Sequence, residues 1–323
     1  MSTDPATAPI CPSCGERGTT GDKWCEACGA DFAGEFESVV GPACVECGAP
    51  HSEIFDGYCS ECGRKQPAER DHLCVVVGDA AGVTDRGKRH HHNEDHFALG
   101  VVGATTISVV CDGVSSTNAP EEASLLAANA ARDSVVAALE SGGVDYEAMI
   151  VEAIGRAQDA AAGVDRDDSS SDPASTTIVA TIVVPDLNEP SIVRTWTGWL
   201  GDSRSYWCYQ PVDDPEAGFV VTQLMTDDVI GASISRWLGA DAADTAPSVQ
   251  VFEHDAGTPD RAAMLLSCSD GLWRYVNEPG QLAALLDTFA AEHDSAVQLA
   301  TALVEFANEQ GGHDNTTVVV VPI

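Results

Sequence analysis

Apolar runs of strand length and stretches of helical spacing succeed one another along the chain after residue 72. Two adjacent helices are predicted at about 120–140, with Asn118 as the N-cap, and at 146–162, and a polar loop follows at 163–175. Two adjacent helices followed by a block of strands differ from alternating βα units, so two packed sheets with outer helices and the α+β class are predicted. Strands are predicted at 73–78, 97–102, 105–111, 176–184, 191–199, 204–209, 219–225, 248–253, 263–268 and 316–322, and helical spacing returns at 282–289 and 296–307.

The segment before residue 67 has a different pattern, set by cysteine. Eight of the 12 cysteines form four CxxC pairs, each followed by glycine, with ten and eleven residues between the pairs of each quartet. Such quartets are typical of tetrahedral sulfur sites, whereas disulfides or a redox CxxC are disfavoured without a secretory signal or a βαβ context. Residues 11–63 resemble the double zinc ribbon family. The resemblance implies two structural Zn²⁺ ions bound by Cys11, Cys14, Cys25, Cys28, Cys44, Cys47, Cys59 and Cys62.

The other cysteines stand singly in apolar strand-like runs and are predicted to be buried thiols. They are Cys74, Cys111, Cys208 and Cys268. A reducing, cytoplasmic compartment suits all twelve. The predicted organisation is a disordered tail at 1–10, the double ribbon at 11–66, a linker at 67–71 and a large domain at 72–323.

Charge limits the classes of partner. The 323 residues include 51 acidic and 16 basic side chains, a formal charge of −35, and residues 1–70 alone carry 12 acidic and five basic ones. Such a field repels nucleic-acid phosphates and anionic lipid, so neither is expected as a partner. No apolar run approaches the ~18–20 residues that span a bilayer.

Several acids of the large domain stand where an apolar strand begins or ends. A single Asp-Gly after a strand is ordinary turn chemistry, but five such places in one domain favour a shared metal site. Oxygen ligands without paired histidines indicate Mg²⁺ or Mn²⁺ rather than zinc. The acids are Glu94 and Asp95, Asp112, Asp202, Asp270 and Asp314.

The order NED, DG, TT, GDSR, SDG and HDNTT across residues 72–323 resembles the metal-dependent (type 2C) serine/threonine protein phosphatases. The resemblance implies an α-β-β-α sandwich with metals between the sheet edges and a dimetal-activated water that attacks the phosphate. It assigns Asp112 as the ligand that bridges two metals, the Gly113 carbonyl as a ligand of one of them, and Asp270 and Asp314 as ligands that complete the first metal. Glu94 and Asp95 are assigned to the second metal, directly or through water, and Asp202 with Asp270 to a weaker third metal. Asn315 is assigned a supporting role. Four further residues either shape the site or simply pack in their strands: Thr176, Thr177, Ser203 and Arg204.

The sequence departs from the family pattern at three places. One is the DG motif, which continues as Val114-Ser115-Ser116-Thr117 without the usual glycines and the histidine that follows them. His90 stands where the family has the arginine that holds the substrate phosphate, so Arg89 or His90 is expected to do so. The flap motif appears as Thr226-Asp227-Asp228 without its histidine, and the segment that follows is short. The shortened flap bears on substrate selection and on the third metal, and it leaves the core ligands in place.

Three functions compete. The leading hypothesis is a bacterial-type signalling enzyme, a Mn²⁺- or Mg²⁺-dependent phosphatase of phosphoserine and phosphothreonine proteins, linked to a serine/threonine kinase system, with ribbons that recruit substrate or regulate access. The alternative is a catalytically weak, phosphatase-like protein that binds phosphoproteins. A zinc-ribbon nucleic-acid protein is the third, and the acidic charge opposes it.

Overall fold

The computed structural model describes residues 44, 47–50, 53–55, 58–64, 66, 68–164, 172–189, 191–211, 213–214, 217–231, 233–255 and 262–323. The chain divides into two compact units, residues 1–67 and 68–323. In the described part of the chain, no helix combines the length and the apolar character needed to cross a membrane.

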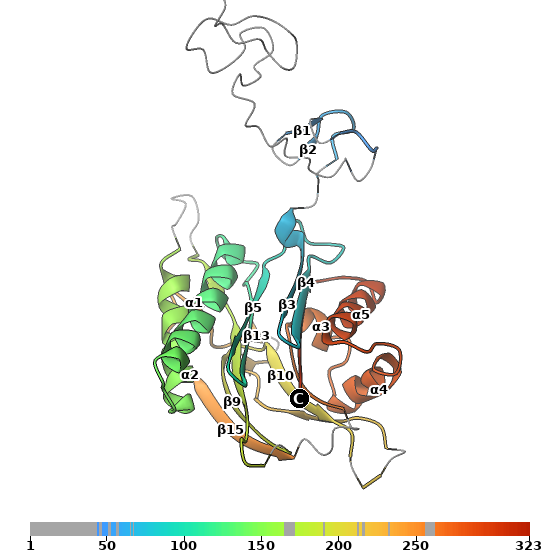
Figure 1. The fold of residues 1–323 in the computed structure, drawn as a ribbon. Helices are drawn as coiled ribbons and strands as arrows, with labels where there is room; N and C mark the ends of the chain where they lie inside the picture. The colour runs from blue at the N-terminus through green and yellow to red at the C-terminus, as the bar shows by residue number, and fades with distance from the viewer. Residues whose placement is uncertain are drawn as a thin grey trace, which may run out of the picture. The chain divides into compact units, whose positions relative to one another are not determined.

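The larger unit contains two antiparallel sheets (Figure 1). The six-stranded sheet has the order β11 (Val220–Gln223), β10 (Arg204–Tyr209), β16 (Ala263–Cys268), β17 (Thr316–Pro322), β4 (Ala80–Asp85) and β3 (His72–Val77). The five-stranded sheet has the order β15 (Ser248–Asp255), β9 (Ile192–Leu200), β8 (Ile178–Pro185), β6 (Thr105–Asp112) and β5 (Asp95–Val102).

Helices cover the outer face of each sheet (Figure 1). α1 (Pro120–Glu140) and α2 (Tyr146–Ala162) pack on the five-stranded sheet, and α3 (Asp270–Trp273), α4 (Pro279–Phe289) and α5 (Ala296–Glu309) pack on the six-stranded one. A third apolar cluster lies between the sheets and includes Phe97, Val110 and Leu265. The predicted α-β-β-α sandwich is therefore confirmed.

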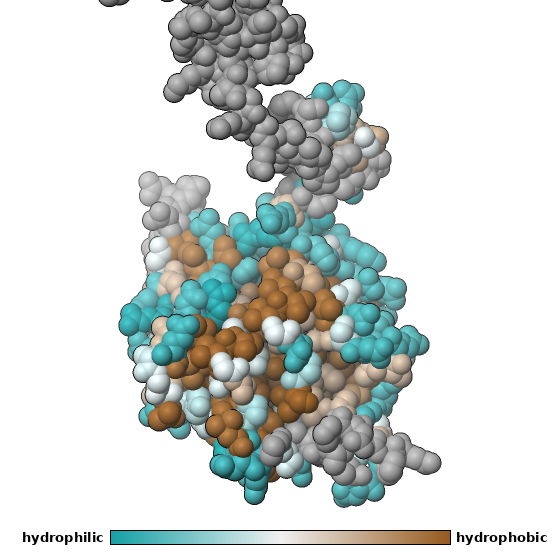
Figure 2. Space-filling view, in the orientation of Figure 1, coloured by the Kyte–Doolittle hydropathy of each residue, from teal (hydrophilic) through white to brown (hydrophobic). Residues whose placement is uncertain are grey.

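The surface follows this layering. Hydrophilic residues dominate the helical flanks, whereas apolar residues gather over the strands in the centre of the view (Figure 2). Val76 on β3 and Val101 on β5 are among the exposed apolar side chains. Both are edge strands of their sheets, so one edge of each lacks a paired neighbour.

Short elements complete the described structure. A 3₁₀ turn (Glu69–Asp71) precedes β3, β7 (Ser175–Thr176) pairs with β14 (Leu238–Gly239), and β12 (Val229–Ile230) forms a hairpin with β13 (Ser233–Ile234). In the smaller unit, β1 (Ile54–Phe55) pairs with β2 (Tyr58–Cys59). Residues 165–171 of the predicted polar loop lie outside the described residues.

Two local predictions were wrong. The N-cap of α1 is Ala119, in the left-handed region at φ 45°, rather than Asn118, whose backbone N–H donates to the Asp172 carbonyl at 3.2 Å. Cys74 is exposed rather than buried, because β3 is an edge strand whose alternate residues point away from the core between the sheets. Cys111, Cys208 and Cys268 are buried as predicted.

Candidate active site

The acids predicted from the sequence meet at one end of the sandwich. Asp95 begins β5 and is the register partner of Asp112, the last residue of β6. Asp270 begins α3 directly after β16, Asp314 precedes β17, and Asp202 lies between β9 and β10. A cavity of about 260 Å³ opens there, lined by Asp112, Gly113, Val114, Ser115, Thr177, Asp202, Ser233, Ile234, Asp270, Arg274 and Asp314.

Asp95 lies beneath this cavity and is 2% exposed. Its Oδ2 accepts hydrogen bonds from the Ser269 hydroxyl at 2.6 Å and the Thr317 hydroxyl at 2.8 Å. Within the described part of the chain its Oδ1 has no hydrogen-bond partner. Burial raises the pKa of Asp95 to about 7, although the two hydroxyls oppose this shift.

The neighbouring carboxyls have raised pKa values for a related reason. Burial, followed by the charges of Asp95 and Asp270, raises the pKa of Asp112 well above its usual range. Burial and then the charge of Asp314 raise the pKa of Asp270 to about 8. Burial and then Asp227 raise the pKa of Asp202. Like charges are thus crowded in a site that needs cationic compensation.

Backbone and hydroxyl contacts fix Asp112. The Thr176 hydroxyl donates to the Asp112 carbonyl at 2.9 Å, and the Asp112 N–H donates to the Thr177 hydroxyl at 3.2 Å. The Thr177 and Ser203 hydroxyls lie 2.7 Å apart. A Cβ at Gly113 would lie 2.6 Å from the Glu94 carbonyl oxygen, so glycine allows this close approach. Thr176 and Thr177 thus contact the backbone of Asp112, and Ser203 contacts Thr177.

Asn315 braces the NED segment. Its side-chain oxygen accepts from the Glu94 N–H at 2.8 Å, and its amide nitrogen donates to the carbonyls of Arg86 at 2.8 Å and His92 at 3.0 Å. Both polar atoms of the Asn315 amide are therefore engaged in hydrogen bonds to the backbone. Asn93 is buried and accepts from the Asp95 N–H at 3.2 Å.

The two candidates for the phosphate clamp differ in position. His90 Nε2 lies 3.1 Å from Asp314 Oδ1, and His90 Nδ1 lies 3.9 Å from Glu94 Oε2. Glu94 also accepts a short hydrogen bond from the Ser115 hydroxyl. Arg89 is exposed and does not belong to the described cavity lining.

The short flap is anchored through Arg204. Its Nε and Nη2 donate to the two carboxylate oxygens of Asp227 at 3.0 and 2.7 Å, and its guanidinium lies 3.8 Å from the centroid of the Trp273 ring. Farther along the flap, Arg236 pairs with Asp228 at 3.4 Å. Together these contacts hold the segment that carries the β12–β13 hairpin.

Several groups that the fold brings to the carboxylates were not predicted from the sequence. Ser269 and Thr317 belong to the SDG and HDNTT segments, yet their hydroxyls gave no separate signal. Arg274 follows Asp270 by one helical turn, and its Nη2 contacts Asp270 Oδ2 at 2.5 Å. The spacing of four residues was the one available signal for that pair.

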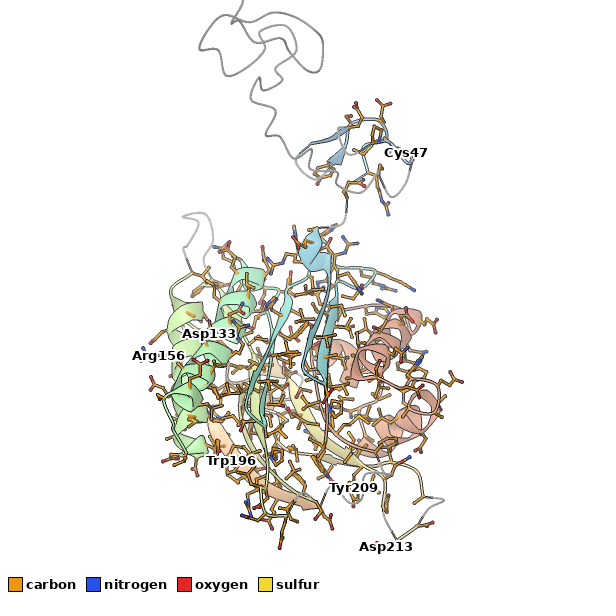
Figure 3. All side chains as sticks on the ribbon, viewed as in Figure 1. Cys47, Asp133, Arg156, Trp196, Tyr209 and Asp213 are labelled. Carbon is orange, nitrogen blue, oxygen red and sulfur yellow. The ribbon has the colours of Figure 1, made fainter. Side chains whose placement is uncertain are left out.

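The second cysteine quartet forms a compact sulfur cluster. The Sγ atoms of Cys44, Cys47, Cys59 and Cys62 all lie within 4.8 Å of one another. Cys44 and Cys62 are 3.6 Å apart, Cys47 and Cys59 are 3.7 Å apart, and Gln66 Nε2 lies 3.3 Å from Cys44 Sγ. Figure 3 labels Cys47 in this unit. The quartet of Cys11, Cys14, Cys25 and Cys28 lies outside the described residues.

The donor set of the larger unit suits a hard cation. It consists of carboxylate oxygens, including the unpartnered Asp95 Oδ1, around a glycine carbonyl. Among the described side chains, only the ribbon cysteines form a set of three or more with all ligand atoms within 4.8 Å. The carboxylates are thus more widely spread, and the guanidinium of Arg274 contacts two of them.

No protein-family model and no curated protein matches the sequence. Solved structures match its fold. A bacterial serine phosphatase is 19% identical with a TM-score of 0.58, over 76% of this chain and 97% of that chain. Stp1 from Staphylococcus aureus is 18% identical with a TM-score of 0.57, over 80% and 99%.

Mycobacterium tuberculosis PstP/Ppp is also similar. It is 23% identical with a TM-score of 0.51, over 77% of this chain and 98% of that chain. A structure of the PstP catalytic domain holds two manganese ions. The chain thus has the fold of the bacterial serine/threonine protein phosphatases, as the sequence resemblance predicted.

Proposed function

We propose that the protein is a metal-dependent phosphatase that hydrolyses phosphoserine and phosphothreonine in proteins. The observation that carries this proposal is the convergence of Asp95, Asp112, Asp202, Asp270 and Asp314 at one end of a phosphatase-type sandwich. No single local motif requires that convergence, because the acids come from separate segments, the first and last of which are more than 200 residues apart.

The carboxylates are suited to Mn²⁺ or Mg²⁺. Asp112 would hold both ions, with the Gly113 carbonyl on one of them. Asp270 and Asp314 would complete the first ion, and Glu94 and Asp95 would serve the second, directly or through water. Asp202 would serve a third, weaker position. When bound, these ions supply an activated water for in-line attack on phosphorus and neutralise the phosphoryl oxygens.

The chain's own residues orient this site. Thr176 and Thr177 hold Asp112, whereas Ser269 and Thr317 fix one oxygen of Asp95 and leave the other oxygen available. The raised pKa values of the carboxyls imply that protons compete with cations for them. We therefore expect activity to depend on added metal and to rise with pH through the neutral range.

The ribbon unit has a separate role in this proposal. Its cysteines bind two structural Zn²⁺ ions, and the unit recruits the phosphoprotein or regulates access to the site. Thiolate ligands suit a reducing cytoplasm. A formal charge of −35 disfavours nucleic acid and anionic membranes as partners, which leaves phosphoproteins of a serine/threonine kinase system.

Hydrolysis of a phosphothreonine peptide with Mn²⁺ tests the proposal. We expect turnover by the full chain and a loss of at least ~10³-fold for Asp112→Asn, because a neutral amide bridges cations poorly. Asp133→Asn, an exposed change on α1, is the matched control. A wild-type chain without turnover, or an Asp112→Asn variant with full turnover, would refute it.

One observation favours the second candidate, a phosphoprotein-binding protein of low catalytic power. His90 and Arg274 both contact Asp314, and these basic groups occupy carboxylate oxygens that a cation would need. Binding of a phosphothreonine peptide without turnover at saturating Mn²⁺ would establish this function instead.

A further inference from the structure

The cavity over the carboxylates has one guanidinium or ammonium group among its described lining residues, that of Arg274. Its Nη2 lies 2.5 Å from Asp270 Oδ2, and its Nη1 lies 3.2 Å from Asp314 Oδ2. The side chain is nevertheless 57% exposed. Some N–H groups of the planar Arg274 guanidinium therefore remain accessible from the cavity and from solvent.

Local structure explains why Arg274 reaches this place. Asp270 begins α3, and Arg274 caps its C-terminus with helical backbone angles of φ −60° and ψ −27°. Residues four apart in a helical turn share a face, so the guanidinium lies beside the Asp270 carboxylate. The same geometry directs it across the cavity to Asp314.

The other basic groups near the site are placed differently. Arg204 is buried and bound to Asp227 in a bidentate pair. Neither Arg89 nor His90 belongs to the described cavity lining. Arg89 is exposed, and His90 offers single ring nitrogens rather than a planar fork. Bidentate recognition of a phosphoryl group is a property of guanidinium. Arg274 therefore has the best combination of chemistry and position.

We propose that Arg274 binds the phosphoryl group of the substrate and that its ion pairs with Asp270 and Asp314 are the resting arrangement. This inference rests on the proposed function, because it assigns the phosphate contact of the same site to a residue other than Arg89 or His90. When the two carboxylates bind divalent cations, the guanidinium exchanges them for phosphoryl oxygens. No covalent bond changes in this exchange.

This arrangement gives Arg274 opposite effects on the affinity of the site for cations and on its affinity for phosphate. Its positive charge touches two carboxylates that the proposed function assigns to metal, so it weakens cation binding in the absence of phosphate. The same charge strengthens phosphate binding. A residue that only supports the fold would lower both affinities or neither.

Titration calorimetry on the full chain tests this. For Arg274→Gln we expect Mn²⁺ to bind about 3- to 10-fold more tightly, and inorganic phosphate to bind the Mn²⁺-saturated protein about 10- to 100-fold more weakly. Arg274→Lys keeps the charge without the fork, so it should retain wild-type Mn²⁺ affinity and an intermediate phosphate affinity.

The matched control is Arg156→Gln. Arg156 makes the same four-residue pair, with Glu152 on α2, is 61% exposed and lies on the outer helical layer (Figure 3). Both affinities should stay unchanged in it. Should Arg274→Gln lower the thermal stability, the comparison of Arg274→Lys with the wild type decides the question.

Unchanged phosphate affinity in Arg274→Gln, weaker Mn²⁺ binding in it, or no phosphate binding by the Mn²⁺-saturated wild type would overturn the proposal. If the wild type hydrolyses no phosphothreonine peptide but the two affinities shift in opposite directions, the phosphatase function fails and the phosphate contact stands. If hydrolysis occurs and the affinities do not move, only the assignment of Arg274 fails.

Discussion

Asp95 and Asp112 are register partners at the start of β5 and the end of β6, so two adjacent strands place two acids side by side at the same end of the sheet. Asp95 Oδ2 is held by two hydroxyls, whereas its Oδ1 has no partner in the described part of the chain. A buried, charged Asp95 is costly when no cation lies beside it, so the site without metal favours the protonated form of this carboxyl.

The stability of the chelator-treated protein should depend on pH through Asp95. Burial raises its pKa from 3.8 to about 7, so its contribution to stability is full below pH 3.8 and is lost as the pH rises through about 7. Asparagine mimics the protonated form. Asp95→Asn should therefore gain stability relative to wild type between pH 4 and 8, by at most on the order of 1 kcal/mol per pH unit.

Thermal unfolding of both chains in chelator, from pH 5 to pH 8, measures this difference. The ribbon unit is the same in both chains, so its loss of metal cancels. Asp133→Asn, whose side chain is 67% exposed, should show no such trend. A constant difference between Asp95→Asn and wild type across this range would show that Asp95 is not protonated in the folded state.

Packing between the sheets should fail if Gly82 gains a side chain. A Cβ at this position on β4 would lie 2.2 Å from the Phe97 ring, so Gly82→Ala should lower the free energy of unfolding by about 1–3 kcal/mol. Gly155→Ala on α2, where nothing lies within 4 Å, should instead stabilise by about 0.5–1 kcal/mol. Denaturant titration compares them. Adding Phe97→Leu should reduce the cost of Gly82→Ala, and full additivity would contradict the steric explanation.

The same glycine explains a limit of sequence analysis. Most strands were predicted because their cores are runs of β-branched residues, and α2 was predicted with its observed bounds. β4 was not predicted, since Ala80-Ala81-Gly82 has weak strand propensity and its small residues are required by Phe97 on the other sheet. A packing constraint between residues of two different sheets leaves no recognisable pattern in the sequence around either residue.

The candidate site could likewise be predicted from the sequence only in part. The acids could be predicted as a group because each stands at a strand boundary, where a lone carboxylate is costly. The partners of Asp95, namely Ser269 and Thr317, could not, since their contacts depend on the register of three strands. The ion pairs of Arg274 likewise depend on how α3 meets the loop before β17.

The anchor of the flap should require a guanidinium. Arg204 is 6% exposed and bonds both oxygens of Asp227, so Arg204→Lys should destabilise the protein by about 1–3 kcal/mol and loosen the flap. Thermal unfolding and proteolysis between residues 224 and 247 check this. Arg194→Lys, at a surface pair 41% exposed, should change stability by less than about 1 kcal/mol. Equal effects of the two changes would contradict the anchoring role.

Zinc content should fall by one ion per chain when Cys44 is replaced by serine. The sulfur atoms of its quartet are 3.6 and 3.7 Å apart in the closest pairs, near the roughly 3.8 Å edge of a tetrahedron with Zn–S bonds of about 2.3 Å and far from the ~2.05 Å of a disulfide. Cys44→Ser should thus hold one Zn²⁺ where the wild type holds two, by atomic absorption of the purified protein. Cys74→Ser, at an exposed thiol on β3, should keep both ions. A zinc-free wild type, or equal losses in the two variants, would show that the quartet is not a zinc site.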